Sequence, residues 1–137
     1  MRPLIIFGGS HKDKRGVLNY NNSFDTSLIK RIYVIENNLN FNRRWQGHKV
    51  EQRWFSAIKG KFIIKLIEID NWKRPSKNLD KISFILKDEN LDVLHIPAGY
   101  ITSITALIEG SKLLVMSNYS LGDTNDNYKY ATDYFAE

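Results

Sequence analysis

The chain of 137 residues contains no cysteine. This absence excludes disulfide bonds, thiolate nucleophiles and cysteine-ligated zinc or iron–sulfur centres. No apolar run approaches the roughly 20 residues that a membrane-spanning helix needs, and the apolar stretch before Gly8-Gly9 is too short for a signal peptide. We therefore expect a cytoplasmic protein with no membrane partner, whose chemistry relies on histidine, tyrosine, lysine, arginine and carboxylate side chains.

Charge of one sign is not concentrated in any part of the chain, although the net charge is +5. A nucleic-acid-binding tail or recognition helix would gather its basic residues on one segment. Here carboxylates are interspersed among separate basic groups, which are Lys12/Lys14/Arg15, Lys30/Arg31, Arg43/Arg44/Lys49/Arg53 and Lys73/Arg74/Lys77. The pattern favours a small anionic ligand over a nucleic-acid partner, and a solvated basic surface with no partner is the alternative.

Helical periodicity is also scarce, and the pattern is that of strands. Between Ile29 and Asn118, β-branched and aromatic residues recur at every second position, the spacing of a half-buried strand. The predicted strands are Ile29–Ile35, Val50–Ile58, Lys61–Ile69, Ile82–Leu86, Leu91–Ile96, Tyr100–Ile108 and Lys112–Asn118. The glycine in Lys59-Gly60 tolerates the positive φ of a tight turn, so the second and third of these strands are expected to form a hairpin.

These features predict an all-β fold, an antiparallel jelly roll, in one domain that spans residues 1–137. Hydrophobic residues make up 42% of the chain and charged residues 26%, which is ordinary for a globular domain. From about residue 120 the tail is polar but carries Tyr128, Tyr130, Tyr134 and Phe135. We expect this aromatic C-terminal tail to dock onto its own domain or onto a partner subunit, because burying each ring is worth about 1.5–3 kcal/mol.

One segment has the character of a functional site. Of the three histidines, His11 lies in a polar stretch that solvent exposure explains, and His95 lies on an apolar strand where a hydrogen-bonded structural role fits. His48 differs because arginines, lysine, glutamines and tryptophans surround it in the sequence. The nearby charges of Glu51 and Arg53 belong at a wet cavity, at an interface or on the exterior rather than in a dry core.

Several short motifs in this order resemble one family. The segment Arg43-Arg44-Trp45-Gln46-Gly47-His48-Lys49, followed by Glu51-Gln52, is similar to the pattern Arg-Gly-x-His-x-His-Lys…Glu-Gln of the cupin nucleotide-sugar 3,4-ketoisomerases, the WxcM-like family. The segment Ile29-Lys30-Arg31-Ile32-Tyr33 is similar to that family's Ile-Lys-Arg-x-Tyr strand, and Asp133-Tyr134-Phe135 resembles its aromatic tail. The segment Val93–Tyr100 resembles the Ile-Pro-x-Gly-Phe/Tyr turn of the related dTDP-4-dehydrorhamnose 3,5-epimerases.

The resemblance implies a double-stranded β-helix, usually a homodimer, that acts without metal or other cofactor on a dTDP-linked 4-keto-6-deoxyhexose in deoxysugar or polysaccharide biosynthesis. A proton next to the ketone is removed to give an enediol, and reprotonation at a neighbouring carbon moves the carbonyl or inverts the centre. On this resemblance His48 is the candidate base, Tyr33 donates to a sugar oxygen or returns the proton, and Arg43 stabilises the oxyanion or binds the diphosphate. The further candidates for substrate binding are Arg31, Arg44, Gln46, Lys49, Arg53, Trp54 and Thr102.

The sequence also departs from the family pattern at two positions. Gln46 occupies the place of the first family histidine, and an amide cannot exchange a proton near neutral pH. The loss of the His-x-His pair also argues against a metal site of that type. Thr102 lies near the place where relatives have another histidine. We favour an enzyme, and the alternative is a catalytically silent cupin that binds a nucleotide sugar or a partner enzyme.

Overall fold

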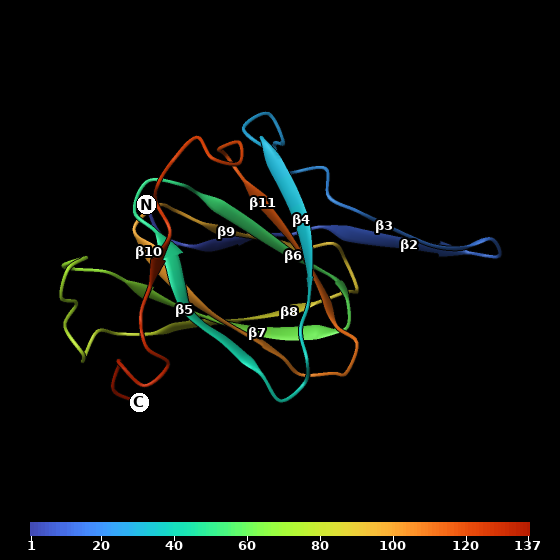
Figure 1. The fold of residues 1–137 in the computed structure, drawn as a ribbon. Helices are drawn as coiled ribbons and strands as arrows, with labels where there is room; N and C mark the ends of the chain where they lie inside the picture. The colour runs from blue at the N-terminus through green and yellow to red at the C-terminus, as the bar shows by residue number, and fades with distance from the viewer.

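Two five-stranded antiparallel sheets face each other in the computed structural model, which describes residues 1–137 (Figure 1). The first sheet has the order β1 (Leu4–Ile6), β9 (Val93–Ile96), β6 (Arg53–Lys59), β11 (Lys112–Ser117) and β4 (Arg31–Glu36). The second has the order β12 (Tyr128–Lys129), β5 (Asn42–His48), β10 (Tyr100–Ala106), β7 (Lys61–Glu68) and β8 (Ile82–Lys87). This arrangement confirms the predicted all-β jelly roll. None of its elements is a helix, and so none is a helical membrane span.

Each strand predicted from alternation is present, because its apolar residues have a sheet face to bury. In β4, Ile32 and Val34 lie on the exposed face, while Tyr33 and Ile35 point inward and are half-buried. The inward residues of β7 are fully buried between the sheets. The two inner faces together form a core of 13 buried residues, to which β7 and β10 contribute most.

Several strands escaped the sequence prediction because they lack apolar alternation. Strand β5 reads NRRWQGH, since much of its inward face borders a polar cavity rather than the core. Strands β2 (Gly9–Asp13) and β3 (Gly16–Tyr20) pair only with each other, and Figure 1 shows this hairpin extending well beyond the two sheets. All five residues of β3 are exposed, so the burial that normally produces a period of two is missing.

The predicted hairpin at Lys59-Gly60 is wrong, although the turn itself is present. Gly60 has the expected positive φ of 78°. A side chain there would also collide with Ser111, whose Oγ lies 2.1 Å from the place of a Cβ. Strand β6, however, belongs to the first sheet and β7 to the second, so the turn carries the chain across the sandwich. A glycine can fix the sharpness of a turn without fixing which strands pair after it.

The aromatic tail packs on the outer face of the second sheet of its own chain. Phe135 is 4% exposed and contacts the ring of Trp45 edge to face, with ring centroids 5.6 Å apart. Tyr130 and Tyr134 pack against the same group and donate hydrogen bonds from their hydroxyls to the carbonyls of Trp72 and Pro75. Of the two docking partners expected for the tail, the structure therefore shows its own domain.

Candidate active site

A cavity opens between the two sheets, beside the end of β5 and the start of β6. It encloses about 740 Å³ of empty space, a volume that includes open solvent at its mouth. Its floor is apolar and includes Phe55, Ile96, Ile104 and Val115 from the core. The polar side chains that line it are Tyr33, Arg43, Gln46, His48, Glu51, Arg53, Tyr100 and Thr102.

His48 is the last residue of β5 and lines this cavity with a side chain that is 14% exposed. Its Nδ1 lies 2.9 Å from the main-chain carbonyl oxygen of Asp126. Burial and the positive charge of Arg53 lower the pKa of His48 below its ordinary value of 6.5, against the opposing effects of the Asp126 carbonyl and the Glu51 carboxylate. The imidazole is therefore neutral at pH 7 and able to accept a proton.

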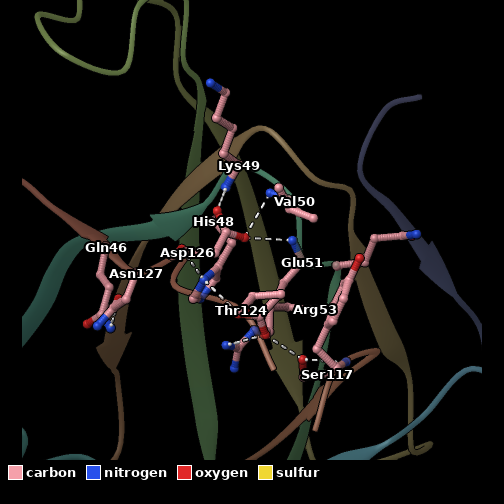
Figure 2. A network of polar contacts seen from close by, with 12 residues as sticks. Gln46, His48, Lys49, Val50, Glu51, Arg53, Ser117, Thr124, Asp126 and Asn127 are labelled. Atoms are coloured by element: carbon pink, nitrogen blue, oxygen red, sulfur yellow. Dashed lines mark hydrogen bonds and ion pairs between the residues drawn. The ribbon is translucent and has the colours of Figure 1, made fainter. Parts of the chain in front are cut away.

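A buried ion pair stands beside the histidine. Arg53 Nη2 donates to Glu51 Oε1 at 3.1 Å, and the two side chains are 8% and 10% exposed. Glu51 also accepts hydrogen bonds from the hydroxyls of Ser117 and Thr124, both at 2.8 Å. Burial alone would raise the pKa of Glu51, but these hydrogen bonds and the charge of Arg53 outweigh it, so that pKa lies below its usual 4.5. The Glu51 carboxylate is thus ionised at neutral pH. Figure 2 shows the polar contacts around it.

Tyr33 is connected to this ion pair through its hydroxyl. Arg53 Nη1 donates to the Tyr33 oxygen at 2.9 Å. Because the oxygen is the acceptor, the phenolic O–H stays free to donate to a ligand. Arg53 Nε is buried and has no partner within the chain.

Arg43 reaches the cavity from the start of β5, and Asn37 holds its guanidinium in place. Arg43 Nε donates to Asn37 Oδ1 at 2.8 Å. Asn37 is 3% exposed, and its amide nitrogen donates to the carbonyls of Phe41 and Ile104, both at 3.2 Å. These bonds fix the amide, which in turn fixes one edge of the guanidinium and leaves its terminal nitrogens available to a ligand.

The open side of the cavity continues into a polar lobe formed partly by the C-terminal tail. Gln46 donates from Nε2 to Asn127 Oδ1 at 2.7 Å, and Thr102 Oγ1 donates to the Gln46 carbonyl at 3.3 Å. Arg31 lines this outer lobe, with its guanidinium 4.7 Å from the centre of the Tyr33 ring. Tail residues 120–122 and 124–127 line the same lobe.

Three residues predicted for substrate binding lie away from the cavity. Trp54 follows the inward-facing Arg53, so it points to the other face of β6, where its ring stacks on His95 with centroids 5.0 Å apart. Arg44 likewise points away from the cavity and reaches Glu137 at 3.5 Å. Lys49 is exposed in the turn after β5. The alternation of side chains along a strand explains the position of Trp54. At Arg44 the register between β5 and β10 shifts, so simple alternation does not apply there.

The structure adds residues that the sequence prediction missed. Tyr100 lines the cavity, and burial together with the negative charge of Glu68 raises the pKa of its phenol. Its signal was present, since it ends the turn motif Val93–Tyr100. Asn37 and Asp126 carried no local signal, because their contacts join segments far apart in the sequence.

The atoms of His48, Glu51 and Asp126 that could ligate a metal ion lie within 4.8 Å of one another, so this cluster is a candidate metal site. Their oxygens are already in use. The Asp126 carboxylate accepts hydrogen bonds from three main-chain N–H groups, and Glu51 is bonded to two hydroxyls and to Arg53. A guanidinium beside the cluster also opposes a second cation. This donor set does not fit a divalent cation as it stands, and metal-independent action remains a prediction.

Solved structures with the same fold were found, although no protein-family model and no curated protein sequence matches the chain. A 3,4-ketoisomerase from Helicobacter canadensis matches at 22% identity over 98% of this chain and 95% of its own, with a TM-score of 0.72. A mutant of the 3,4-ketoisomerase QdtA from Thermoanaerobacterium thermosaccharolyticum, in complex with TDP-4-keto-6-deoxyglucose, matches at 22% identity over 97% and 91%, with a TM-score of 0.72.

A third similar structure is dTDP-4-dehydrorhamnose 3,5-epimerase from Sulfolobus tokodaii. It matches at 15% identity over 98% of this chain and 80% of its own, with a TM-score of 0.76. The similarity therefore extends over nearly the whole chain in each case. It confirms at the level of the fold the resemblance to the ketoisomerase and epimerase cupins that the sequence motifs indicated.

Proposed function

We propose that this cavity is the active site of an isomerase or epimerase of a dTDP-linked 4-keto-6-deoxyhexose. The observation that carries the proposal is the neutral, partly buried His48 beside the Tyr33–Arg53–Glu51 network. Sequence motifs and a shared fold with 3,4-ketoisomerases and 3,5-epimerases support the choice of substrate class. The acidic proton next to a sugar ketone is the kind of proton that such a base can remove.

The chemistry requires a base, a group for the developing oxyanion and a returning proton. In the proposed reaction, the ring nitrogen of His48 that is not bonded to Asp126 takes the proton from the carbon next to the ketone. The C–H electron pair forms a carbon–carbon double bond, and the carbonyl pair moves onto oxygen. Tyr33 donates a hydrogen bond from its O–H to that oxygen. In an isomerisation, a proton returns to the former carbonyl carbon while the adjacent hydroxyl loses its proton and becomes the new carbonyl; in an inversion, the proton returns to the same carbon from the opposite face.

Electrostatics favours an anionic substrate and an anionic intermediate. The guanidiniums of Arg31, Arg43 and Arg53 line the cavity and its outer lobe, whereas Glu51 is the only carboxylate among the residues of the inner cavity. Arg43 and Arg31 are the proposed contacts for the diphosphate. Arg53 polarises Tyr33 and stabilises negative charge on the sugar oxygen.

Solvent-deuterium incorporation tests this proposal. dTDP-4-keto-6-deoxyglucose is incubated in D₂O with the wild type, with His48→Asn and with His11→Asn as a matched control on the exposed β2–β3 hairpin. We expect the wild type and the control to add deuterium to the sugar, and His48→Asn to lose about 10²-fold or more of the exchange rate, the usual contribution of a general base. Binding of dTDP by calorimetry without any exchange in the wild type would reject the isomerase and favour the silent binding protein.

We also propose that the protein is a homodimer. The hairpin β2–β3 projects from the sheets with Val17 and Leu18 60% and 62% exposed. Edge strand β4 exposes Ile32 and Val34 at 64% and 50%. A second copy would cover both features at once, and each buried side chain would contribute about 1.5–3 kcal/mol. Sedimentation velocity should show a dimer that Ile32→Asp weakens, and a monomer at all concentrations would contradict the proposal.

A further inference from the structure

The tail segment Thr124–Asn127 packs against the end of β5 and the turn after it, and it lines the outer lobe of the cavity (Figure 2). Asn127 accepts the hydrogen bond from Gln46, and Thr124 donates to Glu51. The tail then continues as β12, which pairs with β5. A segment near the C-terminus is thus bonded to several polar residues that line the cavity, and Asp126 lies at the centre of these contacts.

The Asp126 carboxylate is directed at the main chain rather than at the cavity. Its Oδ1 accepts the N–H of Lys49 at 2.9 Å, and its Oδ2 accepts the N–H groups of Val50 and Glu51, both at 2.8 Å. Asp126 is 5% exposed. Figure 2 shows these bonds spreading from the one carboxylate to the turn. The lone pairs on the two oxygens together are enough to accept all three N–H groups.

The same residue contacts His48 through a different atom, its main-chain carbonyl. A carbonyl oxygen can only accept, so the 2.9 Å contact assigns the proton of the neutral ring to Nδ1. The Nε2 atom then carries the free lone pair. The Glu51 Oε2 atom is 3.6 Å from Nδ1, which is beyond hydrogen-bond distance. The tautomer of His48 therefore depends on the place of the Asp126 carbonyl.

We infer that Asp126 is a positioning residue: its carboxylate fastens the tail to the turn at residues 49–51, and its carbonyl thereby holds His48 in the Nδ1–H form with Nε2 free to act as base. This inference rests on the proposed function for its catalytic consequence. The geometric part stands without it, since the tautomer is a property of the free protein. The carboxylate anchors the tail, and this anchoring places the carbonyl where it can accept a hydrogen bond from His48 Nδ1.

The test measures the tautomer of His48 by ¹⁵N NMR at a pH where the ring is neutral, in protein without ligand. Asp126→Ala removes both carboxylate oxygens, and Asp126→Asn keeps the side-chain size but leaves one oxygen for three donors. Asp123→Asn is the matched control, because Asp123 lies in the same tail segment, is exposed and has no side-chain contact with the turn. Folding of each variant is checked by the dispersion of its amide spectrum.

We expect the wild type and Asp123→Asn to show the Nδ1–H form alone, and Asp126→Ala to show a mixture of both tautomers. Asp126→Asn should give a smaller shift in the same direction, and it decides the question if Asp126→Ala does not fold. A folded Asp126 variant that keeps the pure Nδ1–H form would overturn the inference. Deuterium exchange should fall about 10-fold or more in Asp126→Ala, as expected when a base loses its orientation. If the wild type catalyses no exchange but the tautomer shifts as expected, only the proposed function fails.

Discussion

Replacing Glu51 by glutamine tests how much the buried Glu51–Arg53 ion pair, which lines the cavity, contributes to stability. In the wild type Glu51 accepts hydrogen bonds from Arg53, Ser117 and Thr124. The Arg53 side chain is 8% exposed, so Glu51→Gln leaves a nearly buried guanidinium without a counter-charge. Removing one partner of a buried pair costs about 3–5 kcal/mol. We expect about 3 kcal/mol, the lower end, because the glutamine oxygen still accepts one of the three bonds.

This loss is measured by urea unfolding and by thermal melting. For a chain of this length, about 3 kcal/mol corresponds to a fall in Tm of about 10 °C. The double variant Glu51→Gln/Arg53→Met removes both charges and should recover much of the lost stability, because an apolar side chain needs no counter-charge. The double-mutant cycle with Arg53→Met alone then gives the coupling between the two residues.

The difference in unfolding free energy between the wild type and Glu51→Gln should depend on pH in one direction. The folded-state pKa of Glu51 lies below its usual 4.5, so its stabilising contribution is present above pH 4.5 and is lost as the pH falls through the folded value. The gap between the wild type and Glu51→Gln should therefore be widest near neutral pH and close on acidification. A loss below about 1 kcal/mol, as for an exposed pair, would refute the reasoning, and so would a double variant as unstable as the sum of the two single variants.

Two further predictions concern the base and the second arginine. Because burial and the charge of Arg53 lower the pKa of His48 below 6.5, the midpoint of the acid limb of deuterium exchange should lie below pH 6.5. Arg53→Met should move that limb to higher pH, and an unshifted limb would contradict the electrostatic cause. Asn37→Ala removes the hydrogen-bond partner of Arg43 Nε. We expect the affinity for dTDP, measured by calorimetry, to fall about tenfold, because the guanidinium loses the charge-assisted hydrogen bond that orients it. An unchanged affinity would show that Asn37 does not orient Arg43.

The sequence predicted the parts of this fold in which burial follows the chain at period two. Strands such as β4 and β7 alternate because one face packs into the core. Strand β5 could not be found in this way, since its inward residues serve a polar cavity. The turn at Gly60 was predicted from its residue type, but the sheet that receives the next strand depends on packing of the whole sandwich.

The residues of the candidate site also divide into those that the local sequence could indicate and those that it could not. His48, Tyr33, Arg43, Gln46, Arg53 and Thr102 line the cavity, and Arg31 lines its outer lobe. Trp54 was placed in the site by its neighbours in sequence, but strand alternation turns it to the opposite face. Asp126 was missed because its contacts with the turn and with His48 span 75 or more residues. No local pattern reports such a contact.

The central claim is that His48 removes a proton from the carbon next to a sugar ketone. A ¹H NMR time course of dTDP-4-keto-6-deoxyglucose in D₂O follows that proton directly. With the wild type, its signal should disappear at a rate proportional to the protein concentration. With His48→Asn, the signal should decay no faster than in solution without protein. A signal that decays equally in both proteins, or in neither, would contradict the claim.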